Sequence, residues 1–265
     1  MDKIRVLVTG ANGQLGKTIQ ELFSKNTFNI DFTFLDKAKL DITNKDAVNK
    51  HLGMQKYQYC INCAAYTNVD QAEKTPKIAY AVNAYGVKNL AESCKKNETI
   101  LIHISTDYVF DGEKKEAYTI ADKPNPINEY GKSKYQGEFH IQDVMNQYFV
   151  VRTSWLYSKN YGHNFYRTIV NKAQEQSVLH VTDSQKGCPT DTENLSKALI
   201  SIIVKKNNDY GIHHFCDEKA MTWYDFAKLI LSEKFKLNII RLVKTDKYIT
   251  FTNRPKNSIL INSLK

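Results

Sequence analysis

The sequence predicts an α/β fold in which helices cover both faces of a doubly wound parallel sheet. Three observations lead to this prediction. Short apolar, β-branched runs alternate with amphipathic helical segments over the first 156 residues, which is the pattern of successive βαβ units. The first run, IRVLVTG at 4–10, leads directly into a glycine-rich turn. After residue 156 the elements become shorter, which indicates a smaller second part.

Each predicted element follows from a local pattern. The run at 4–10 is apolar and ends in glycine, and the segment after it places Leu15, Ile19, Leu22 and Phe23 on one helical face. We expect further strands at 32–35, 57–64, 99–105 and 148–154, and further helices at 44–53, 77–96 and around Tyr130. Because strands alternate with helices, the sheet is expected to be parallel.

Composition limits the classes of protein that come into question. The chain has 265 residues, 42% hydrophobic and 25% charged, which is ordinary for a folded soluble protein. No apolar run approaches the roughly 20 residues that span a bilayer. The N-terminus, MDKIRVLVTG, begins a strand pattern at once and lacks the anatomy of a signal peptide. We therefore expect a cytoplasmic protein without a membrane partner.

The formal net charge of +9 does not by itself indicate nucleic-acid binding. The excess comes from 32 lysines against 5 arginines, and the lysines are spread along the whole chain. We expect no nucleic-acid partner, although a positive field would help to attract a small anionic substrate. The five cysteines are scattered, and the Cys60-x-x-Cys63 pair lies in an apolar run without a second pair. Buried thiols are favoured there over a zinc or redox site.

The first strand runs into GANGQLG, with glycines at positions 10, 13 and 16. A tight turn lets the backbone approach a pyrophosphate, and the following helix offers free N–H groups to that anion. Asp36 ends the second strand, where a carboxylate would bind the adenosine ribose. The motif predicts dinucleotide binding rather than a structural turn. Asp36 disfavours a 2′-phosphate and Lys37 and Lys39 offset that effect, so NADPH and NADH both remain open.

The chemistry is predicted from ISTDYVFDG at 104–112 and NEYGKSKYQGE at 128–138. Thr106 follows the fourth strand, while Tyr130 and Lys134 lie one turn apart on one helical face. A lysine ammonium and the oxidised nicotinamide would lower the pKa of Tyr130 and fit it for proton transfer. Thr106 would hold a carbonyl oxygen in line. Together these residues predict reduction of a carbonyl group by hydride transfer.

A set of motifs in order along the whole chain resembles the extended short-chain dehydrogenase/reductase family and, within it, the reductases of dTDP-4-dehydrorhamnose. The matching stretches are GANGQLG (10–16), LDIT (40–43), NCAAYTNVDQAE (62–73), NAYGVKNLA (83–91), STDYVFDG (105–112), PNPINEYGKSKYQGE (124–138), VRTSWLY (151–157), NF (164–165) and RPKNS (254–258). The resemblance implies a Rossmann-type fold, a dTDP-sugar substrate, NAD(P)H, and formation of dTDP-L-rhamnose.

The resemblance also implies roles for individual residues. The catalytic set would be Thr106, Tyr130 and Lys134. The cofactor would contact Gly10, Gly13, Gln14, Leu15, Gly16, Asp36, Asp41, Ile42, Ala64, Ala65, Thr67, Tyr130 and Lys134. The sugar nucleotide would contact Thr106, Tyr108, Trp155, Asn164 and Arg254. Tyr108 and Trp155 could equally be core aromatics, whereas the guanidinium fork of Arg254 suits a diphosphate.

The predicted organisation has two parts: an NAD(P)-binding part at 1–156 and a smaller substrate-binding part at 157–265, partly interleaved with the first. Relatives in the family continue past the Arg-Pro motif, so the second part is expected to be short at its C-terminus. Some relatives dimerise through a carboxylate-bound magnesium. The helix after Gly16 begins KTIQ, without an acidic residue. We therefore expect no metal, and either a monomer or a homodimer.

Other functions come from different classes. A 4,6-dehydratase would place an Asp-Glu pair after the threonine, whereas this chain has Asp107-Tyr108. A 4-epimerase would keep its dinucleotide bound, which absorbance spectra of the purified protein would show. A regulatory subunit, as reported for methionine adenosyltransferase, would bind dinucleotide without turnover and would copurify with a partner enzyme.

Overall fold

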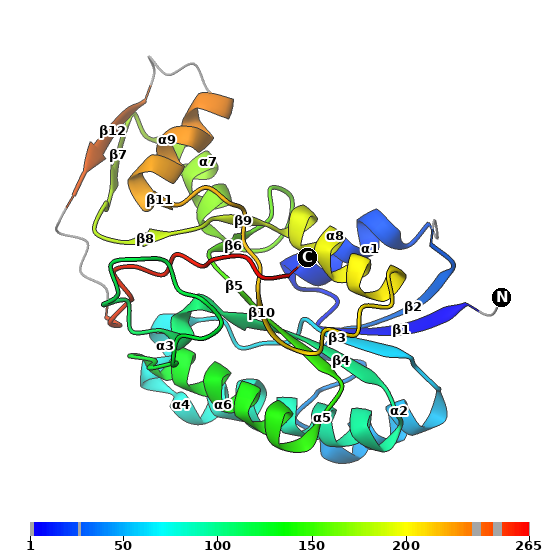
Figure 1. The fold of residues 1–265 in the computed structure, drawn as a ribbon. Coiled ribbons are helices and arrows are strands. Elements are labelled where there is room, and N and C mark those ends of the chain that lie inside the picture. The colour runs from blue at the N-terminus through cyan, green and yellow to red at the C-terminus, as the bar shows by residue number, and fades with distance from the viewer. Residues whose placement is uncertain (1–2, 26–27, 235–239, 246–250, 265) are drawn as a thin grey trace.

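The computed structural model describes residues 3–25, 28–234, 240–245 and 251–264 (Figure 1). Its centre is a six-stranded sheet in the order β10-β5-β4-β3-β1-β2, and all five strand pairs are parallel. The strands are β1 (Ile4–Thr9), β2 (Ile30–Leu35), β3 (Tyr59–Asn62), β4 (Ile100–Thr106), β5 (Tyr148–Thr153) and β10 (Gly211–His214). The predicted parallel, doubly wound sheet is therefore confirmed.

Helices cover both faces of this sheet (Figure 1). On one face α1 (Gln14–Phe23) and α8 (Thr192–Val204) bury their apolar residues against alternate strand residues such as Val6, Val8 and Ile61. On the other face lie α2 (Lys45–Met54), α5 (Val87–Lys96) and α6 (Glu129–Val144). Alternation along the strands sends neighbouring residues to opposite faces, which is why Leu7 belongs to the second core.

The helix expected at 77–96 is interrupted. The chain forms α3 (Val69–Lys74), α4 (Pro76–Tyr80), the π-helical segment η1 (Ala81–Gly86) and then α5. Asn83 lies in η1, and its amide donates to the Tyr66 carbonyl at 2.9 Å and to the Ser133 hydroxyl at 3.0 Å. These contacts come from residues 17 and 50 positions away, so helical periodicity alone does not predict the π turn.

A third apolar core lies in the later half of the chain. It joins α7 (Phe165–Glu175), α9 (Trp223–Lys234), β7 (Val178–Val181) and β12 (Arg241–Lys244), with Tyr166, Phe226 and Ile230 buried at its centre. Short strand pairs connect it to the main sheet: β6 (Leu156–Tyr157) with β9 (Thr190–Asp191), and β8 (Lys186–Gly187) with β11 (Met221–Thr222). By sequence β10 belongs to this half, and by pairing it belongs to the main sheet.

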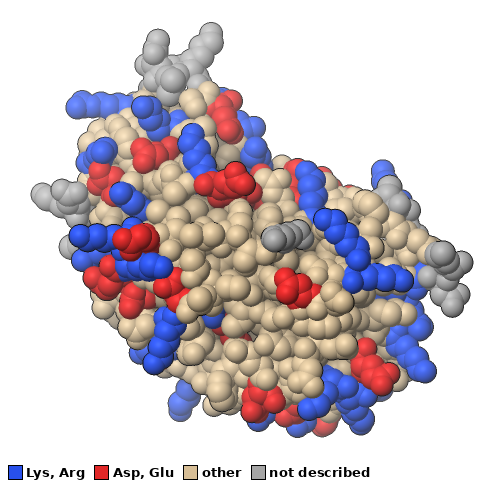
Figure 2. Space-filling view, viewed as in Figure 1, with Lys and Arg blue, Asp and Glu red and all other residues tan. Residues whose placement is uncertain are grey.

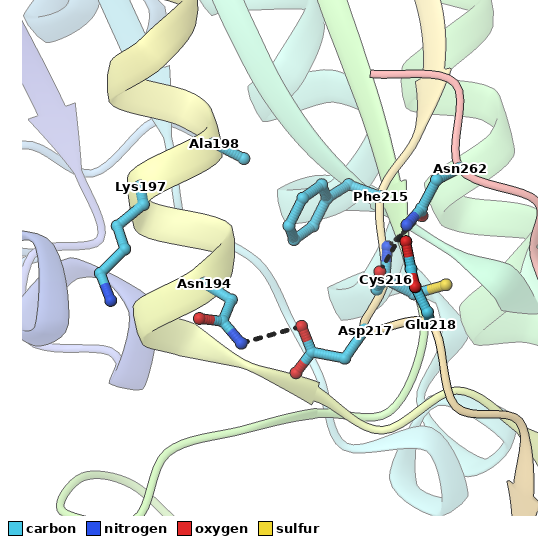
Figure 3. A pocket seen from close by; sticks show the side chains of 8 residues that line it. All are labelled: Asn194, Lys197, Ala198, Phe215, Cys216, Asp217, Glu218 and Asn262. Atoms are coloured by element: carbon cyan, nitrogen blue, oxygen red, sulfur yellow. Dashed lines mark hydrogen bonds between the residues drawn. The ribbon is translucent and has the colours of Figure 1, made fainter. Parts of the chain in front are cut away.

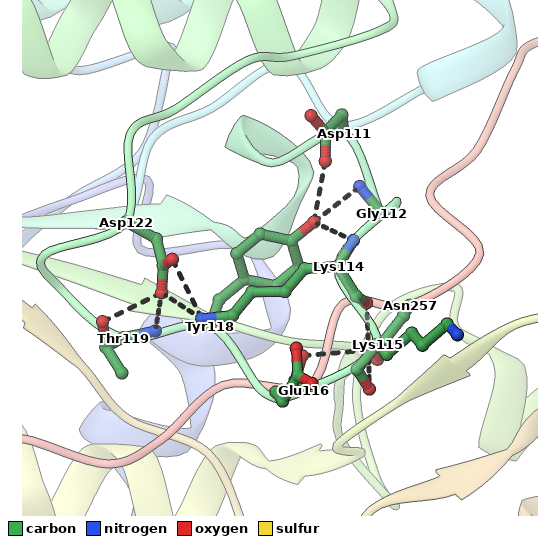
Figure 4. A network of polar contacts seen from close by, with 9 residues as sticks. All are labelled: Asp111, Gly112, Lys114, Lys115, Glu116, Tyr118, Thr119, Asp122 and Asn257. Carbon is green, nitrogen blue, oxygen red and sulfur yellow. Dashed lines mark hydrogen bonds and ion pairs between the residues drawn. The ribbon is translucent and has the colours of Figure 1, made fainter.

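Residues 251–264, called the strap below, run back along the loop at 111–122. The Asn257 amide nitrogen donates to three successive carbonyls, those of Lys114, Lys115 and Glu116, at 2.8–3.1 Å (Figure 4). Backbone hydrogen bonds join Tyr118 to Ile259 and Ile261. The strap is thereby fixed beside the loop that follows β4 and the 3₁₀ turn η2 (Asp107–Val109).

The surface carries mixed charge. On the face seen in Figure 2, lysine and arginine side chains are spread around the periphery and are interspersed with aspartate and glutamate. In the part of the chain that the structure describes, no helix is both long and apolar enough to cross a bilayer.

Candidate active site

The glycine-rich turn lies between the end of β1 and the start of α1. Gly10 has φ of +63°, and a Cβ there would stand 2.5 Å from the Ala64 backbone nitrogen. Gly13 precedes the first turn of α1, and its own N–H donates to the Gly10 carbonyl at 2.9 Å. A side chain at position 10 would be strained and would collide with the backbone after β3. The turn therefore keeps open a cradle bounded by backbone.

A cavity of about 360 Å³ opens beside this turn. Seven residues predicted to contact the cofactor line it: Gly10, Gly13, Asp36, Asp41, Ile42, Ala64 and Ala65. Lys37, which the sequence analysis placed beside Asp36, also lines it, together with residues that the sequence analysis did not assign to the site, namely Asn12, Leu40, Cys63, Tyr66 and Val82. The carboxyl ends of β1, β2 and β3 converge here, as they do at ligand sites of open α/β sheets.

Asp36 is held in place at the rim of this cavity. The Asn12 amide donates to Asp36 Oδ2 at 2.7 Å, and the Lys39 backbone N–H donates to Oδ1 at 3.1 Å. Nearby, the backbone N–H of Thr43 holds the pKa of Asp41 below its usual value. The signal for Asn12 was available in the sequence, since this asparagine lies inside the glycine motif.

Other residues predicted to contact the cofactor lie outside the cavity lining. Leu15 and Gly16 are buried in α1, and Thr67 is exposed in the loop before α3. Gln14 connects the two halves of the chain: its amide donates to the Leu156 carbonyl at 3.1 Å, and its oxygen accepts from Asn164 at 3.0 Å. Contacts of these residues with a cofactor stay predictions.

Thr106, Tyr130 and their neighbours meet where β4 ends and α6 begins. The Thr106 hydroxyl donates to Asp107 Oδ1 at 2.9 Å and also hydrogen-bonds the Tyr130 phenol. Burial raises the pKa of Tyr130, the Thr106 hydroxyl acts in the opposite direction, and Asp107 and Tyr108 add to the increase. The phenol is therefore kept in its protonated form at neutral pH.

Lys134 lies one turn after Tyr130 in α6 and is buried. Its ammonium nitrogen lies 2.6 Å from the Ile104 carbonyl oxygen and 3.3 Å from His103 Nε2. Burial lowers the pKa of Lys134 to about 8, while the Glu138 carboxylate acts in the opposite direction. The groups that act on the pKa of Tyr130 are those of Thr106, Asp107 and Tyr108. An effect of Lys134 on Tyr130 therefore stays a prediction.

Arg254 reaches the site from the strap. Its Nη2 forms an ion pair with Asp70 at 3.1 Å, and its Nη1 lies 3.4 Å from the Tyr108 hydroxyl. Burial raises the pKa of Tyr108 to about 12. The Tyr108 ring meets the Tyr130 ring edge-on, with centroids 5.8 Å apart. A continuous row therefore leads from Arg254 through Tyr108 to Tyr130 and Thr106.

Comparison with known proteins identifies the family to which the chain belongs. Residues 4–264 match the family model described as RmlD substrate binding domain. The dTDP-4-dehydrorhamnose reductase of Aggregatibacter actinomycetemcomitans is 39% identical over 266 residues, which cover 97% of this chain and 90% of that protein. The chain belongs to the family of dTDP-4-dehydrorhamnose reductases.

Solved structures of the reductase family have the same fold. The dTDP-4-dehydrorhamnose reductase of Bacillus anthracis, solved in complex with NADP, is 39% identical with a TM-score of 0.92, and the match covers 98% of this chain and 91% of that one. The orthologue from Clostridium acetobutylicum is also 39% identical, with a TM-score of 0.91 and coverage of 97% and 90%. The Rossmann-like architecture predicted from the sequence is confirmed.

Two further residues that the reductase resemblance assigned to the substrate have defined surroundings. Trp155 has φ of +48°, and its ring stacks on Trp223 with centroids 3.4 Å apart. A Cβ on Gly187 would stand 2.4 Å from this ring. Trp155 therefore packs between the two halves of the chain, and Trp223 is a partner that the sequence analysis missed.

Asn164 is already engaged in hydrogen bonds within the chain. Its oxygen accepts from the Arg167 N–H at the start of α7, and its amide nitrogen donates to Gln14 and to the carbonyls of Ser158 and Tyr161. The structure thus gives Asn164 a part in joining α7 to the glycine-rich turn. A contact with the sugar nucleotide stays a prediction.

The cysteines do not form a metal site, and a further hollow lies elsewhere on the described part of the molecule. Cys60 is buried against Cys94, and Cys63 lines the cavity beside the glycine-rich turn, near Lys134. Within the described residues, no three His, Cys, Asp or Glu side chains gather in an arrangement that could hold a metal ion. A second hollow of about 410 Å³ lies between α8 and the segment after β10, where Asn194 donates to Asp217 at 3.0 Å (Figure 3).

Proposed function

We propose that this chain reduces the 4-keto group of dTDP-4-dehydro-L-rhamnose to give dTDP-L-rhamnose, with NADPH or NADH as the reductant. The observation that carries the proposal is the hydrogen bond between Thr106 and Tyr130 where β4 ends, with Lys134 one turn further along α6. Lys134 acts on the pKa of Cys63, which lines the glycine-bounded cavity at the carboxyl edge of the sheet. The name of the relatives supports the same substrate and reaction.

The residues around the cavity fit a nicotinamide dinucleotide. Gly10 and Gly13 leave the backbone uncovered at the N-terminus of α1, where a pyrophosphate would be held by N–H groups. The Asp36 carboxylate, fixed by Asn12, would accept hydrogen bonds from the adenosine ribose. The reduced nicotinamide, when bound, supplies the hydride for the sugar carbonyl carbon. Lys37 also lines the cavity, so both NADPH and NADH remain open.

Tyr130 is the proposed proton donor to the carbonyl oxygen. Because burial keeps the phenol protonated, it holds the proton that the oxygen needs when the carbonyl becomes an alcohol. The ammonium form of Lys134, on the same face of α6, would stabilise the resulting Tyr130 phenolate. Both residues lie on one rigid helix, which fixes their separation.

Thr106 is the proposed second contact to the carbonyl oxygen. A hydroxyl carries one proton, and here that proton is directed at Asp107. Asp107 also accepts from Ser154 at 3.0 Å and from the Ser258 hydroxyl. With these other donors in place, the Thr106 hydroxyl can turn its proton from Asp107 to the substrate oxygen. The Asp107 carboxylate then still accepts hydrogen bonds from the other hydroxyls.

Arg254 is the proposed contact to the diphosphate of the sugar nucleotide. Among the described residues, its Nε has no hydrogen-bond partner although it is buried, so one edge of the guanidinium has a free donor. A fork-shaped guanidinium binds phosphate oxygens in a bidentate manner. The Asp70 carboxylate would hold the other edge in position.

The organisation of the molecule is part of the proposal. Residues 1–156 would bind the dinucleotide, and residues 157–265 would contribute the sugar side, with α8 and β10 interleaved into the main sheet. The relatives are named as biosynthetic reductases, which supports the proposal that the protein works in the cytoplasm, as a monomer or homodimer.

The test measures loss of nicotinamide absorbance with dTDP-4-dehydro-L-rhamnose generated in situ, with NADH and NADPH offered separately. Steady oxidation is expected, and the ratio of the two rates tells whether Asp36 or its neighbouring lysines dominate. An absence of oxidation with both dinucleotides, although each one binds, would contradict the proposal.

The Tyr130→Phe variant tests the proton donor. Turnover should fall by about a hundredfold or more, because general acid catalysis contributes that much, while dinucleotide affinity stays near that of the wild type. Tyr135→Phe, a change at the next turn of the same helix, is the matched control and should keep its activity. Turnover by Tyr130→Phe within a few-fold of the wild type would rule out this role.

A further inference from the structure

Four fully buried polar side chains form a row across the sheet, beneath α6. They are Thr9 on β1, Asn62 on β3, His103 on β4 and Lys134 on α6, each exposed by 2% or less. Thr9 and Asn62 are register partners, and so are Asn62 and His103. Side chains of register partners point to the same face, so the row is continuous from the glycine-rich turn to the catalytic helix.

The orientation of the Asn62 amide is fixed by its neighbours. Its Oδ1 accepts from the Ala64 backbone N–H at 3.1 Å and from the Thr9 hydroxyl at 2.7 Å. A backbone N–H can only donate, so the atom facing it has to be the oxygen. Consequently the Asn62 nitrogen faces His103 Nδ1, at 3.0 Å, and donates to it.

This donor determines the tautomer of His103. A ring nitrogen that accepts a hydrogen bond carries no proton, so neutral His103 has its proton on Nε2. Burial and the neighbouring Lys134 lower the pKa of His103 well below its usual value, which keeps the ring neutral. The Nε2–H points at Lys134 Nζ, 3.3 Å away.

A donor facing a lysine nitrogen distinguishes the two forms of that lysine. An ammonium has three donors and no acceptor, whereas a free amine has a lone pair that accepts from Nε2–H. We infer that His103 is a positioning residue that favours the free amine of Lys134, because Asn62 fixes the His103 proton on Nε2. Under the proposed function, on which this consequence rests, the ammonium that stabilises the Tyr130 phenolate is then in equilibrium with the amine at the pH where the enzyme works.

Several other titratable groups face Lys134. Cys63 lies in the segment after β3, Glu138 lies one turn further along α6, and Tyr130 lies one turn earlier. Glu138 favours the ammonium, but both its oxygens are bonded to Arg152 at 2.7–3.2 Å. Burial raises the pKa of Cys63, so this thiol is neutral. His103 is therefore the titratable neighbour that contacts Nζ from the sheet, at 3.3 Å. The Ile104 carbonyl, 2.6 Å from Nζ, can accept from the amine and from the ammonium alike.

Nuclear magnetic resonance of lysine labelled with ¹³C at Cε measures the inference without turnover. One of the 32 lysine signals should titrate near pH 8 and should vanish in Lys134→Met, while exposed lysines titrate above about pH 10. Histidine ¹⁵N spectra of the wild type should show His103 with a bare Nδ1 and a protonated Nε2. A protonated Nδ1, or a Lys134 signal that titrates with the other lysines, would overturn the inference.

Asn62→Asp should move the His103 proton from Nε2 to Nδ1 with almost no change in the shape of the side chain at position 62. A carboxylate accepts from His103 Nδ1–H, which leaves Nε2 with a lone pair that accepts from the Lys134 ammonium. The midpoint of Lys134 should therefore move upward by about one pH unit or more, and the alkaline limb of kcat/KM should move with it.

The same substitution in a His103→Phe background is the matched control. Phe cannot change tautomer, so Asn62→Asp should there shift the Lys134 midpoint by much less. An equal shift in both backgrounds would mean that the added charge acts through space, and His103 would then have no such role. An enzyme without turnover whose NMR titrations behave as expected would contradict the proposed function and leave this inference standing.

Discussion

The two ends of the candidate active site are built in different ways. At the proposed dinucleotide end, all the lining except Val82 in η1 comes from segments that directly follow β1, β2 and β3, so that each of these contributions is a short contiguous motif. At the sugar end, Tyr108 meets Arg254 across 146 positions of sequence, and Trp155 stacks on Trp223 across 68. The first end is therefore specified by local backbone geometry and the second by packing between distant segments.

This difference decides which changes each end tolerates. The turn at Gly10 depends on one residue type, because its φ and the approach of Ala64 exclude a side chain. The sugar end depends on the strap and on the contact between Trp155 and Trp223. The strap and this contact each combine several weaker interactions. Substitutions should therefore act abruptly at the first end and by degrees at the second.

Gly10→Val should have the largest effect. Positive φ and collision with backbone each cost about 1–3 kcal/mol, so dinucleotide affinity should fall by about a thousandfold, measured by fluorescence titration. Gly53→Ala is the control, because a Cβ there meets nothing within 4 Å. If Gly10→Val bound dinucleotide as tightly as Gly53→Ala does, the cavity beside the turn would not be the dinucleotide site.

Asp107 lies where the two ends meet, and its burial raises the pKa of its carboxyl to about 6 from 3.8. Since the folded state then binds the proton more tightly than the unfolded state, this group's contribution to stability falls as pH rises from about 4 to 6. The difference amounts to about 3 kcal/mol. The free energy of unfolding of Asp107→Asn, measured with urea, should depend less on pH across that window than that of the wild type. Parallel curves of free energy against pH would contradict this.

Arg254→Lys should weaken the sugar end by an intermediate amount. Lysine keeps the positive charge but lacks the guanidinium fork, whose Nη2 pairs with Asp70 while its Nε stays free for a phosphate. KM for the sugar nucleotide should therefore rise by about tenfold, while dinucleotide affinity is unchanged. Arg241→Lys, at an exposed position on β12, is the matched control. Equal KM values for the two variants would remove Arg254 from the site.

Gly187→Ala should have the smallest effect. The added methyl group would meet the Trp155 side chain and not the backbone, so the ring can yield by shifting away from Trp223. We expect a KM for the sugar nucleotide that is a few-fold higher and a changed tryptophan emission spectrum, since the chain has 2 tryptophans. A changed spectrum with unchanged KM would show that Trp155 does not touch the substrate.

The sequence was sufficient to predict the features that depend on local geometry. The glycine turn, the carboxyl-edge position of Thr106 and the one-turn spacing of Tyr130 and Lys134 all follow from periodicity and residue type. The π turn at Asn83, the amide bonds of Asn164 and the stacking of Trp223 did not follow, because their partners lie far away in sequence. Asn12 and Asp70 lay inside recognised motifs, but their roles became visible only through Asp36 and Arg254.

The strap has a consequence for the order in which the protein matures on the ribosome. The docking of residues 257–261 on the loop at 114–118 holds Arg254 near Tyr108, and Asn257 is synthesised 143 residues after Lys114. The turn at Gly10 and the ends of β1, β2 and β3 emerge much earlier. A nascent chain can therefore assemble the cavity beside Gly10 before the strap has been synthesised, whereas the contact between Arg254 and Tyr108 has to wait for the strap.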